Sequence, residues 1–240
     1  MFVPIYDDNP LRSIHRPIVN WLLILANIAV FALQTTAFSD RFAASFAIVP
    51  AELLRVGMFG GPALGPHDAL PVPESYTLLS YMFLHGDIVH LVGNMLFLWV
   101  FGDNVEDALG HLRYLAFYVA CGVAGGLAHT AILPTSDVPL IGASAAVAGV
   151  VTGYLLLYPR VLVWVLVFRF IPIRISAAFA LGAWILTQIF MASAPYVIPG
   201  AEVGPVAWWA HIGGILAGGL LVLVLRRDSA SPMSGGGTSA

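Results

Sequence analysis

Three groups of polar side chains interrupt stretches of the chain that are otherwise apolar. They are His85, His90 and Asn94, then the run Gly142-Ala143-Ser144, and finally His211. Ionisable groups inside a membrane are costly, and for that reason they mark function. A serine hydroxyl becomes a nucleophile when a nearby imidazole removes its proton. If folding brings Ser144 to His211, the expected chemistry is hydrolysis within the membrane.

The remaining polar groups are suited to stabilising the charge that develops in such a reaction. His90 and Asn94 are four residues apart, so they share one face of a helix. The Asn94 amide, a His90 ring N–H and the Ser144 backbone N–H are therefore the expected donors to an oxyanion. Gly142 and Ala143 are small enough to let a substrate backbone come close.

The base is expected to act without a carboxylate partner. His211 would accept the Ser144 proton during attack on a peptide carbonyl and later protonate the leaving amine. Glu202 is the nearest acidic residue in sequence, but we expect it in an external loop. The sequence therefore predicts a Ser–His dyad. We give His85 only a supporting role, as a partner of a loop carbonyl or of water.

The composition indicates a membrane protein. Of the 240 residues, 59% are hydrophobic and only 10% are charged, whereas soluble domains carry about 25% charged residues. The net charge of −3 argues against nucleic acid as a partner. Cys121 is the single cysteine, so no intrachain disulfide can form. We expect neither a metal nor a cofactor.

Apolar stretches of about 20 residues predict the membrane spans. The sequence between the fourth and fifth is interrupted by arginines and Pro172, and is expected to form a loop or hairpin at the membrane surface over 159–174. The fold class predicted is an all-α membrane protein, a bundle of six transmembrane helices. The six spans are Ile18–Thr36, Leu78–Phe101, Leu112–Leu133, Leu140–Tyr158, Ile175–Ala192 and Val206–Leu225.

The arginines predict the orientation of this bundle. If the N-terminus is cytoplasmic, eight of the ten arginines fall on the cytoplasmic side, as the positive-inside rule requires. Both termini are then cytoplasmic. We expect a cytoplasmic segment over 1–17, a core over 18–225 and a disordered tail over 226–240. Within the core, 38–75 is expected to lie partly in the membrane interface, and Trp208 and Trp209 to join an aromatic belt.

The second, fourth and sixth helices would all enter from the external side, so the three polar groups converge at one membrane face. Small residues repeat along the fourth and sixth helices, and such faces let membrane helices approach closely. This packing would bring the His211 imidazole to the Ser144 hydroxyl. The residues on these two faces are Ala145, Gly149 and Gly153, and His211, Gly214 and Gly218.

The same residues resemble the motifs of the rhomboid family of intramembrane serine proteases. The similarity extends over the whole predicted core, from about Ile18 to Leu225, and its four motifs occur in order on the expected helices. They read His85-Gly-Asp-Ile-Val-His90-Leu-Val-Gly-Asn94-Met95, Trp99-Val-Phe-Gly102-Asp-Asn-Val-Glu106-Asp-Ala-Leu-Gly110, Gly142-Ala-Ser144 and Ala210-His211-Ile-Gly-Gly214-Ile-Leu-Ala-Gly218.

The resemblance implies that Ser144 is the nucleophile and His211 the base, with His90 and Asn94 at the oxyanion site. It also implies that the fifth helix, with the loop after it, is a lateral gate for a transmembrane substrate. Three places depart from the family pattern, and one of them is the stretch Glu74-Ser75-Tyr76-Thr77, where a Trp-Arg pair is frequent before the second helix. Ala145 replaces a common glycine, and Ala148 stands where an aromatic residue often stacks on the histidine.

Other functions remain compatible with these residues. One is a catalytically inactive relative that binds membrane helices as a chaperone or adaptor, and another is a small transporter with a histidine proton relay. The expected partners of a protease are a transmembrane protein substrate and membrane lipid. The compact six-helix form favours a bacterial inner membrane. The sequence does not indicate the physiological substrate or the oligomeric state.

Overall fold

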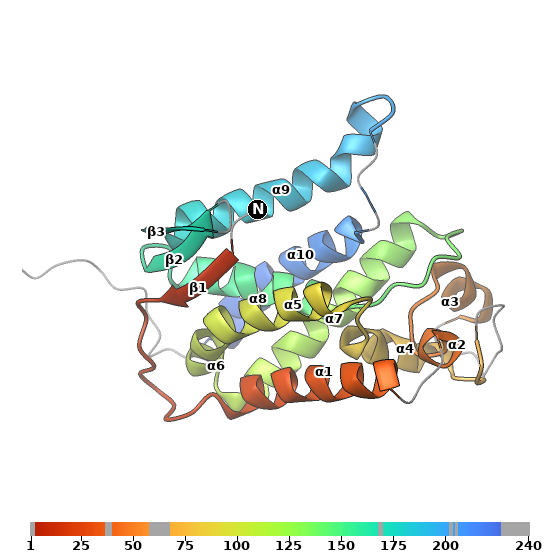
Figure 1. Ribbon diagram of the computed structural model, residues 1–240, viewed down its shortest axis with the longest axis horizontal. Coiled ribbons are helices and arrows are strands. Elements are labelled where there is room, and N and C mark those ends of the chain that lie inside the picture. The colour runs from red at the N-terminus through yellow and green to blue at the C-terminus, as the bar shows by residue number, and fades with distance from the viewer. Residues whose placement is uncertain are drawn as a thin grey trace, which may run out of the picture.

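The computed structural model describes residues 3–36, 40–57, 68–167, 170–201, 204 and 206–226. Within them the protein is mostly helical, with long helices packed side by side along the longest axis of the molecule (Figure 1). Five helical stretches are long and apolar enough to cross a membrane, and α8 (Ser144–Leu157) is a shorter apolar helix. The five are α1 (Ile18–Thr36), the continuous stretch Ile88–Leu109, α7 (His111–Ile132), α9 (Ala177–Val197) and α10 (Trp208–Leu225). The chain is thus a multi-pass membrane protein, and the count of six spans remains a prediction.

The second predicted span is not one helix from Leu78 to Phe101. α4 (Glu74–Ser80) and η1 (Tyr81–Phe83) end before His85, and a new helix begins at Ile88. The break occurs because the Asp87 carboxylate accepts hydrogen bonds from the Val89 and His90 backbone N–H groups, at 2.7 and 2.8 Å. Asp87 is therefore the N-cap of α5 (Ile88–Phe97).

α5 continues without interruption through a π-helical stretch, η2 (Leu98–Gly102), into α6 (Asp103–Leu109). The Asn20 side chain on α1 donates a hydrogen bond of 2.8 Å to the Leu98 carbonyl. A Cβ atom at Gly102 would lie 2.2 Å from the Asn20 Oδ1 atom, so only glycine lets α1 pack this closely. The widened turn and the buried Asn20 thus fix α1 against the second helical stretch.

A small antiparallel sheet corrects the prediction of an all-α fold. Its strands are β1 (Val3–Asp7), β2 (Leu162–Val167) and β3 (Ile171–Ser176), in the order β1-β2-β3. Valine and tryptophan in β2 suit a half-buried strand, and the predicted hairpin over 159–174 is formed by β2 and β3. The sheet lies at the end of the bundle where α1 begins, which we call the N-terminal end (Figure 1).

Carboxylates of α6 hold the N-terminal segment to this end. Asp107 accepts hydrogen bonds of 2.6 to 3.0 Å from three consecutive backbone N–H groups, over residues 12–14. Glu106 is fully buried and accepts from the N–H groups of Val19 and Asn20, at 3.0 and 2.7 Å. Because Glu106 caps the start of α1, the N–H groups of that helix end are already satisfied.

The described residues of the segment 38–75, which are 40–57 and 68–75, lie at the opposite end of the bundle, with α2 (Asp40–Ala44) and α3 (Pro50–Val56) beside α4 (Figure 1). Ile48 is fully buried and forms an isolated β-bridge with Leu140, so this segment is packed onto the chain just before α8. Residues 58–67 within it lie outside the described residues, as do Glu202 and the tail over 227–240.

Small residues bring α7, α8 and α10 into contact. A Cβ atom added at Gly214 would lie 2.0 Å from the Ala145 carbonyl oxygen, and one at Gly218 would lie 2.5 Å from the Gly149 Cα atom. On the other side of α10, a Cβ atom at Gly213 would lie 2.8 Å from the Ala124 carbonyl oxygen of α7. Backbone-to-backbone packing therefore fixes the depth of α8 relative to α10, and with it the heights of Ser144 and His211.

Candidate active site

Ser144 and His211 are in hydrogen-bond contact. Ser144 is the first residue of α8 and His211 lies in the first turn of α10, both at the end of the bundle opposite the sheet. The Ser144 Oγ atom lies 2.8 Å from the His211 Nε2 atom. The histidine is only 7% exposed, whereas Ser144 is half-buried. This distance is the one that a nucleophile and its base require.

The second ring nitrogen of His211 has a partner that we did not predict. Its Nδ1 atom lies 2.8 Å from the Oε1 atom of Gln188, which is 4% exposed on α9. Because an amide oxygen only accepts, this contact assigns the ring proton to Nδ1 and leaves the Nε2 lone pair facing Ser144. The Gln188 amide nitrogen in turn donates to the Trp184 carbonyl at 3.0 Å, which holds the side chain in place.

Two tryptophans contact the His211 ring. Trp184 of α9 stacks on it with 6.4 Å between ring centroids and 25° between planes. Trp208 meets it edge-on at 5.8 Å and 84°, and its place in an aromatic belt stays a prediction. The position four residues after Ser144 is the small, fully buried Ala148. The ring contact that Ala148 cannot provide thus comes from α9 and from the start of α10.

His90 lies beside the Gly142-Ala143-Ser144 run. Gly142 has a φ of +121°, and a Cβ atom on it would lie 2.7 and 2.8 Å from the Cε1 and Nε2 atoms of His90. Glycine is required because other residues rarely adopt this φ and because a Cβ atom would collide with the His90 ring. The Gly86 N–H donates to the His90 Nδ1 atom at 3.5 Å, a long contact that favours a proton on Nε2, the atom facing Gly142.

Asn94 is already engaged by another predicted residue. Its Nδ2 atom lies 3.1 Å from the Nε2 atom of His85, and both side chains are buried. His85 lies before α5, and its ring contacts that of His90 with 5.0 Å between centroids. The Gln34 amide nitrogen of α1 donates to the His85 carbonyl at 2.8 Å, and its amide oxygen accepts from the His85 N–H at 3.1 Å. His85 thus positions both Asn94 and His90.

The backbone around Ser144 offers further donors. The first intrahelical hydrogen bond of α8 runs from the Val147 N–H to the Ala143 carbonyl at 3.0 Å. The N–H groups of residues 144–146 precede it and belong to the unsatisfied start of a helix. The Gly142 N–H is bonded to the Tyr81 carbonyl at 2.9 Å instead. The Ser144 N–H and the His90 side chain, which lies against Gly142, are therefore the groups beside Ser144 that suit an oxyanion, whereas Asn94 is connected to them through His85.

A group of carboxylates lies apart from this site, in the 38–75 segment and its neighbours. Glu52, Asp68 and Glu74 are buried, with one oxygen from each within 4.8 Å of the others. Burial, followed by the nearby charges of Glu52 and Asp68, raises the pKa of Glu74 to about 7. A proton on Glu74 neutralises part of the charge near neutral pH. Carboxylates alone do not define a metal site.

These elements define a class of protein: a multi-pass helical membrane protein with a buried Ser–His contact near one end of the bundle. The comparison with protein families agrees with this class. The Rhomboid domain family model matches residues 72–228, which is more than half of the chain. The chain belongs to the rhomboid family.

Curated relatives support the same conclusion. RHOMBOID-like protein 6, mitochondrial, of Arabidopsis thaliana is 28% identical over 90% of this chain and 71% of its own length. Rhomboid protease GluP of Bacillus subtilis is 40% identical over 32% of this chain and 14% of its own length. Inactive rhomboid protein 1 of Drosophila melanogaster is 31% identical over 41% of this chain and 7% of its own length. The chain spans about half the length of several others.

The names of these relatives bear on activity and location. One is called a protease and one inactive, so family membership alone does not decide whether this chain cleaves proteins. The Arabidopsis relative is named mitochondrial, and the expected bacterial inner membrane is not supported by the relatives as a group. Membership does make this an integral membrane protein.

Proposed function

We propose that this rhomboid-family chain is an intramembrane serine endopeptidase. The single observation that carries the proposal is the 2.8 Å contact between Ser144 Oγ and His211 Nε2, with Gln188 holding the opposite ring nitrogen. An inactive helix-binding protein has no need for a serine aligned with an imidazole whose tautomer is fixed. The hydrogen-bonded series Gln188–His211–Ser144 fulfils the requirement that nucleophile, base and orienting group meet.

Each residue has a separate role in the proposed reaction. His211 Nε2 removes the Ser144 proton as Oγ attacks a peptide carbonyl, and the imidazolium later protonates the leaving amine. The carbonyl oxygen gains negative charge and is stabilised by the Ser144 N–H and by the His90 and Asn94 side chains. Water then attacks the acyl carbonyl while His211 accepts its proton, and the imidazolium returns that proton to Ser144 Oγ as the ester bond breaks and the product acid leaves. Gln188 positions the base, and His85 positions the oxyanion donors.

The proposed substrates are transmembrane proteins cleaved in or near a membrane helix. An intact helix hides its carbonyls in hydrogen bonds, so segments with small residues that unwind easily are the best candidates. The bundle has six spans in this proposal, with α8 as the shortest, and both termini are cytoplasmic. The site then lies near the external face of its membrane, where water can reach it.

The test is cleavage of a single-span model substrate by the purified chain in lipid vesicles. Ser144→Ala and His211→Ala should each abolish cleavage and labelling by a fluorophosphonate probe. Ser193→Ala is the matched control, because this half-buried serine of α9 bonds the Phe190 carbonyl, at 3.0 Å, away from His211. If Ser144 is not labelled in the folded protein and no cleavage occurs, the chain is a helix-binding relative without activity.

A further inference from the structure

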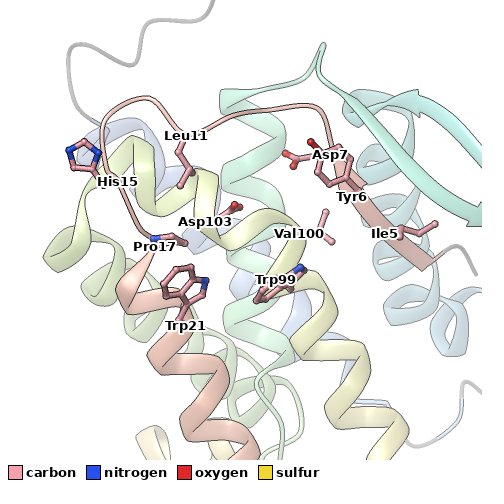
Figure 2. A pocket seen from close by; sticks show the side chains of 10 residues that line it. All are labelled: Ile5, Tyr6, Asp7, Leu11, His15, Pro17, Trp21, Trp99, Val100 and Asp103. Atoms are coloured by element: carbon pink, nitrogen blue, oxygen red, sulfur yellow. The ribbon is translucent and has the colours of Figure 1, made fainter.

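A cavity opens at the N-terminal end of the bundle, on the opposite side of the protein from Ser144. It has a volume of about 280 Å³ and lies between β1, the start of α1 and the second helical stretch. Figure 2 shows Trp21 of α1 and Trp99 of η2 on one side, Asp7 of β1 on the other, and Asp103 of α6 between them. The mouth is therefore aromatic and acidic.

The charges of this cavity favour a cationic ligand. Two carboxylates line it, and the one basic group among the described lining residues is His15, in the loop before α1. The backbone donors that could hold an anion here are occupied, because Glu106 and Asp107 accept from the N–H groups at the start of α1 and in the segment before it. Burial raises the pKa of Asp7 to about 6, and its carboxylate also accepts a hydrogen bond from the Tyr154 hydroxyl.

The tryptophans suit the same kind of ligand. The face of an indole ring attracts an ammonium group, and aromatic rings around a cation are a recurring recognition device. Trp21 is 44% exposed and Trp99 is 60% exposed. Tryptophans of this kind are common at the level of lipid headgroups. They stand where an ammonium headgroup would lie if the bundle crosses a bilayer along its helices.

The cavity continues into an apolar groove along α1. A second hollow of about 310 Å³ shares Trp21 and Trp99 with the first and is otherwise lined by Ile24, Leu25 and Ile28. Its lining is almost wholly apolar, and it extends along α1 away from the N-terminal end. One ligand that fills both hollows must have a small cationic head and a hydrocarbon chain.

We propose that this composite site binds a zwitterionic phospholipid with a primary ammonium headgroup, of the phosphatidylethanolamine type. The ammonium donates to Asp103 and Asp7 and contacts the Trp21 and Trp99 rings. One acyl chain lies along Ile24 and Ile28, and the phosphate faces the rim near His15. A primary ammonium fits better than a quaternary one because carboxylates accept N–H hydrogen bonds, which a trimethylated nitrogen cannot donate.

The site can be tested by measuring lipid binding to the purified full chain, independently of proteolysis. Native mass spectrometry would compare phosphatidylethanolamine, phosphatidylcholine and phosphatidylglycerol with identical acyl chains. We expect phosphatidylethanolamine to bind about tenfold more tightly than either of the others, the difference that one charged hydrogen bond gives. Equal binding of the three lipids would refute the proposal.

Variants locate the bound lipid. Asp103→Asn should weaken phosphatidylethanolamine binding by about tenfold. The matched control Asp8→Asn removes the same charge nearby, but Asp8 pairs with Arg174 outside the cavity, and binding should be unchanged. Phosphatidylethanolamine with brominated chains should quench tryptophan fluorescence less in Trp21→Phe and Trp99→Phe variants. Equal loss in both aspartate variants, or unchanged quenching, would place the lipid elsewhere. If Asp103→Asn does not fold, the comparison of the three lipid headgroups in the unaltered chain still tests the proposal.

Discussion

Gln188 provides the sharpest test of the proposed mechanism. Gln188→Leu would leave the buried Nδ1–H of His211 without its acceptor, which costs about 1–3 kcal/mol for a buried polar group. Part of that cost falls on the transition state, because the ring no longer has one fixed orientation and tautomer. A loss of about 2 kcal/mol corresponds to roughly 30-fold in rate. We therefore expect kcat to fall by about 10- to 100-fold while KM changes little.

The assay compares cleavage of a single-span substrate with the rate of fluorophosphonate labelling, because both need an activated Ser144. Gln188→Glu keeps an acceptor oxygen at the same reach but loses the donor to the Trp184 carbonyl, so it should recover part of the activity lost in Gln188→Leu. Thr187→Val is the control, since Thr187 is exposed on the same turn of α9 and bonds only the Ala183 carbonyl, at 2.9 Å. Unchanged kcat in Gln188→Leu would falsify the positioning role of Gln188.

Three further predictions concern packing and pH. Gly214→Ala places a Cβ atom 2.0 Å from the Ala145 carbonyl oxygen and should lower the thermal denaturation midpoint sharply or prevent folding, whereas at Gly219 the nearest atom would be 3.6 Å away and alanine should be tolerated. Tyr154→Phe removes a donor from the buried Asp7 carboxylate and should cost about 1–3 kcal/mol, with faster proteolysis of residues 8–16 as the second readout. Burial raises the pKa of Glu74 from its ordinary 4.5 to about 7, so the folded chain binds the proton more tightly. The free energy of unfolding should then decrease as the pH rises from about 4.5 to above 7. Glu74→Gln should flatten this slope, and denaturation at pH 5 and pH 8 would measure it; an equal slope in the variant would assign the pH dependence to another group.

The local motifs placed Ser144 and His211 on separate helices, and the small residues around them indicated the close packing. That inference was possible because glycine and alanine at four-residue spacing leave few ways to pack two membrane helices. The break before α5 was harder to foresee. Leu78 to Phe101 is apolar throughout most of its length, but η1 ends at Phe83, and the Asp87 side chain begins a new helix through two hydrogen bonds to α5.

Other features depend on partners far away in the sequence. β1 has only five residues, and it is a strand because it pairs with β2 more than 150 residues later. The role of Gln188 is equally hard to predict from the sequence, since a single glutamine in an apolar helix usually bonds the backbone of its own helix. Its amide nitrogen does so, but its oxygen is directed to His211. The one indication of this role in the sequence was the amide itself, a lone polar side chain in an apolar helix.

The arrangement around His211 explains how the site accommodates Ala148. The resemblance to rhomboid proteases implies an aromatic ring on the serine helix, where it would stack on the imidazole. In this chain α8 is close-packed through small residues, and Trp184 and Gln188 supply the ring contact and the hydrogen bond from α9. The helix assigned by resemblance to the lateral gate therefore also carries the residues that hold the proposed base, His211. If α9 moves outward to admit a substrate, it must do so while Gln188 stays on His211, or the base loses its orientation until α9 returns. A cross-link that fixes α9 in an outward position, away from α10, should then reduce fluorophosphonate labelling of Ser144 even with no protein substrate present.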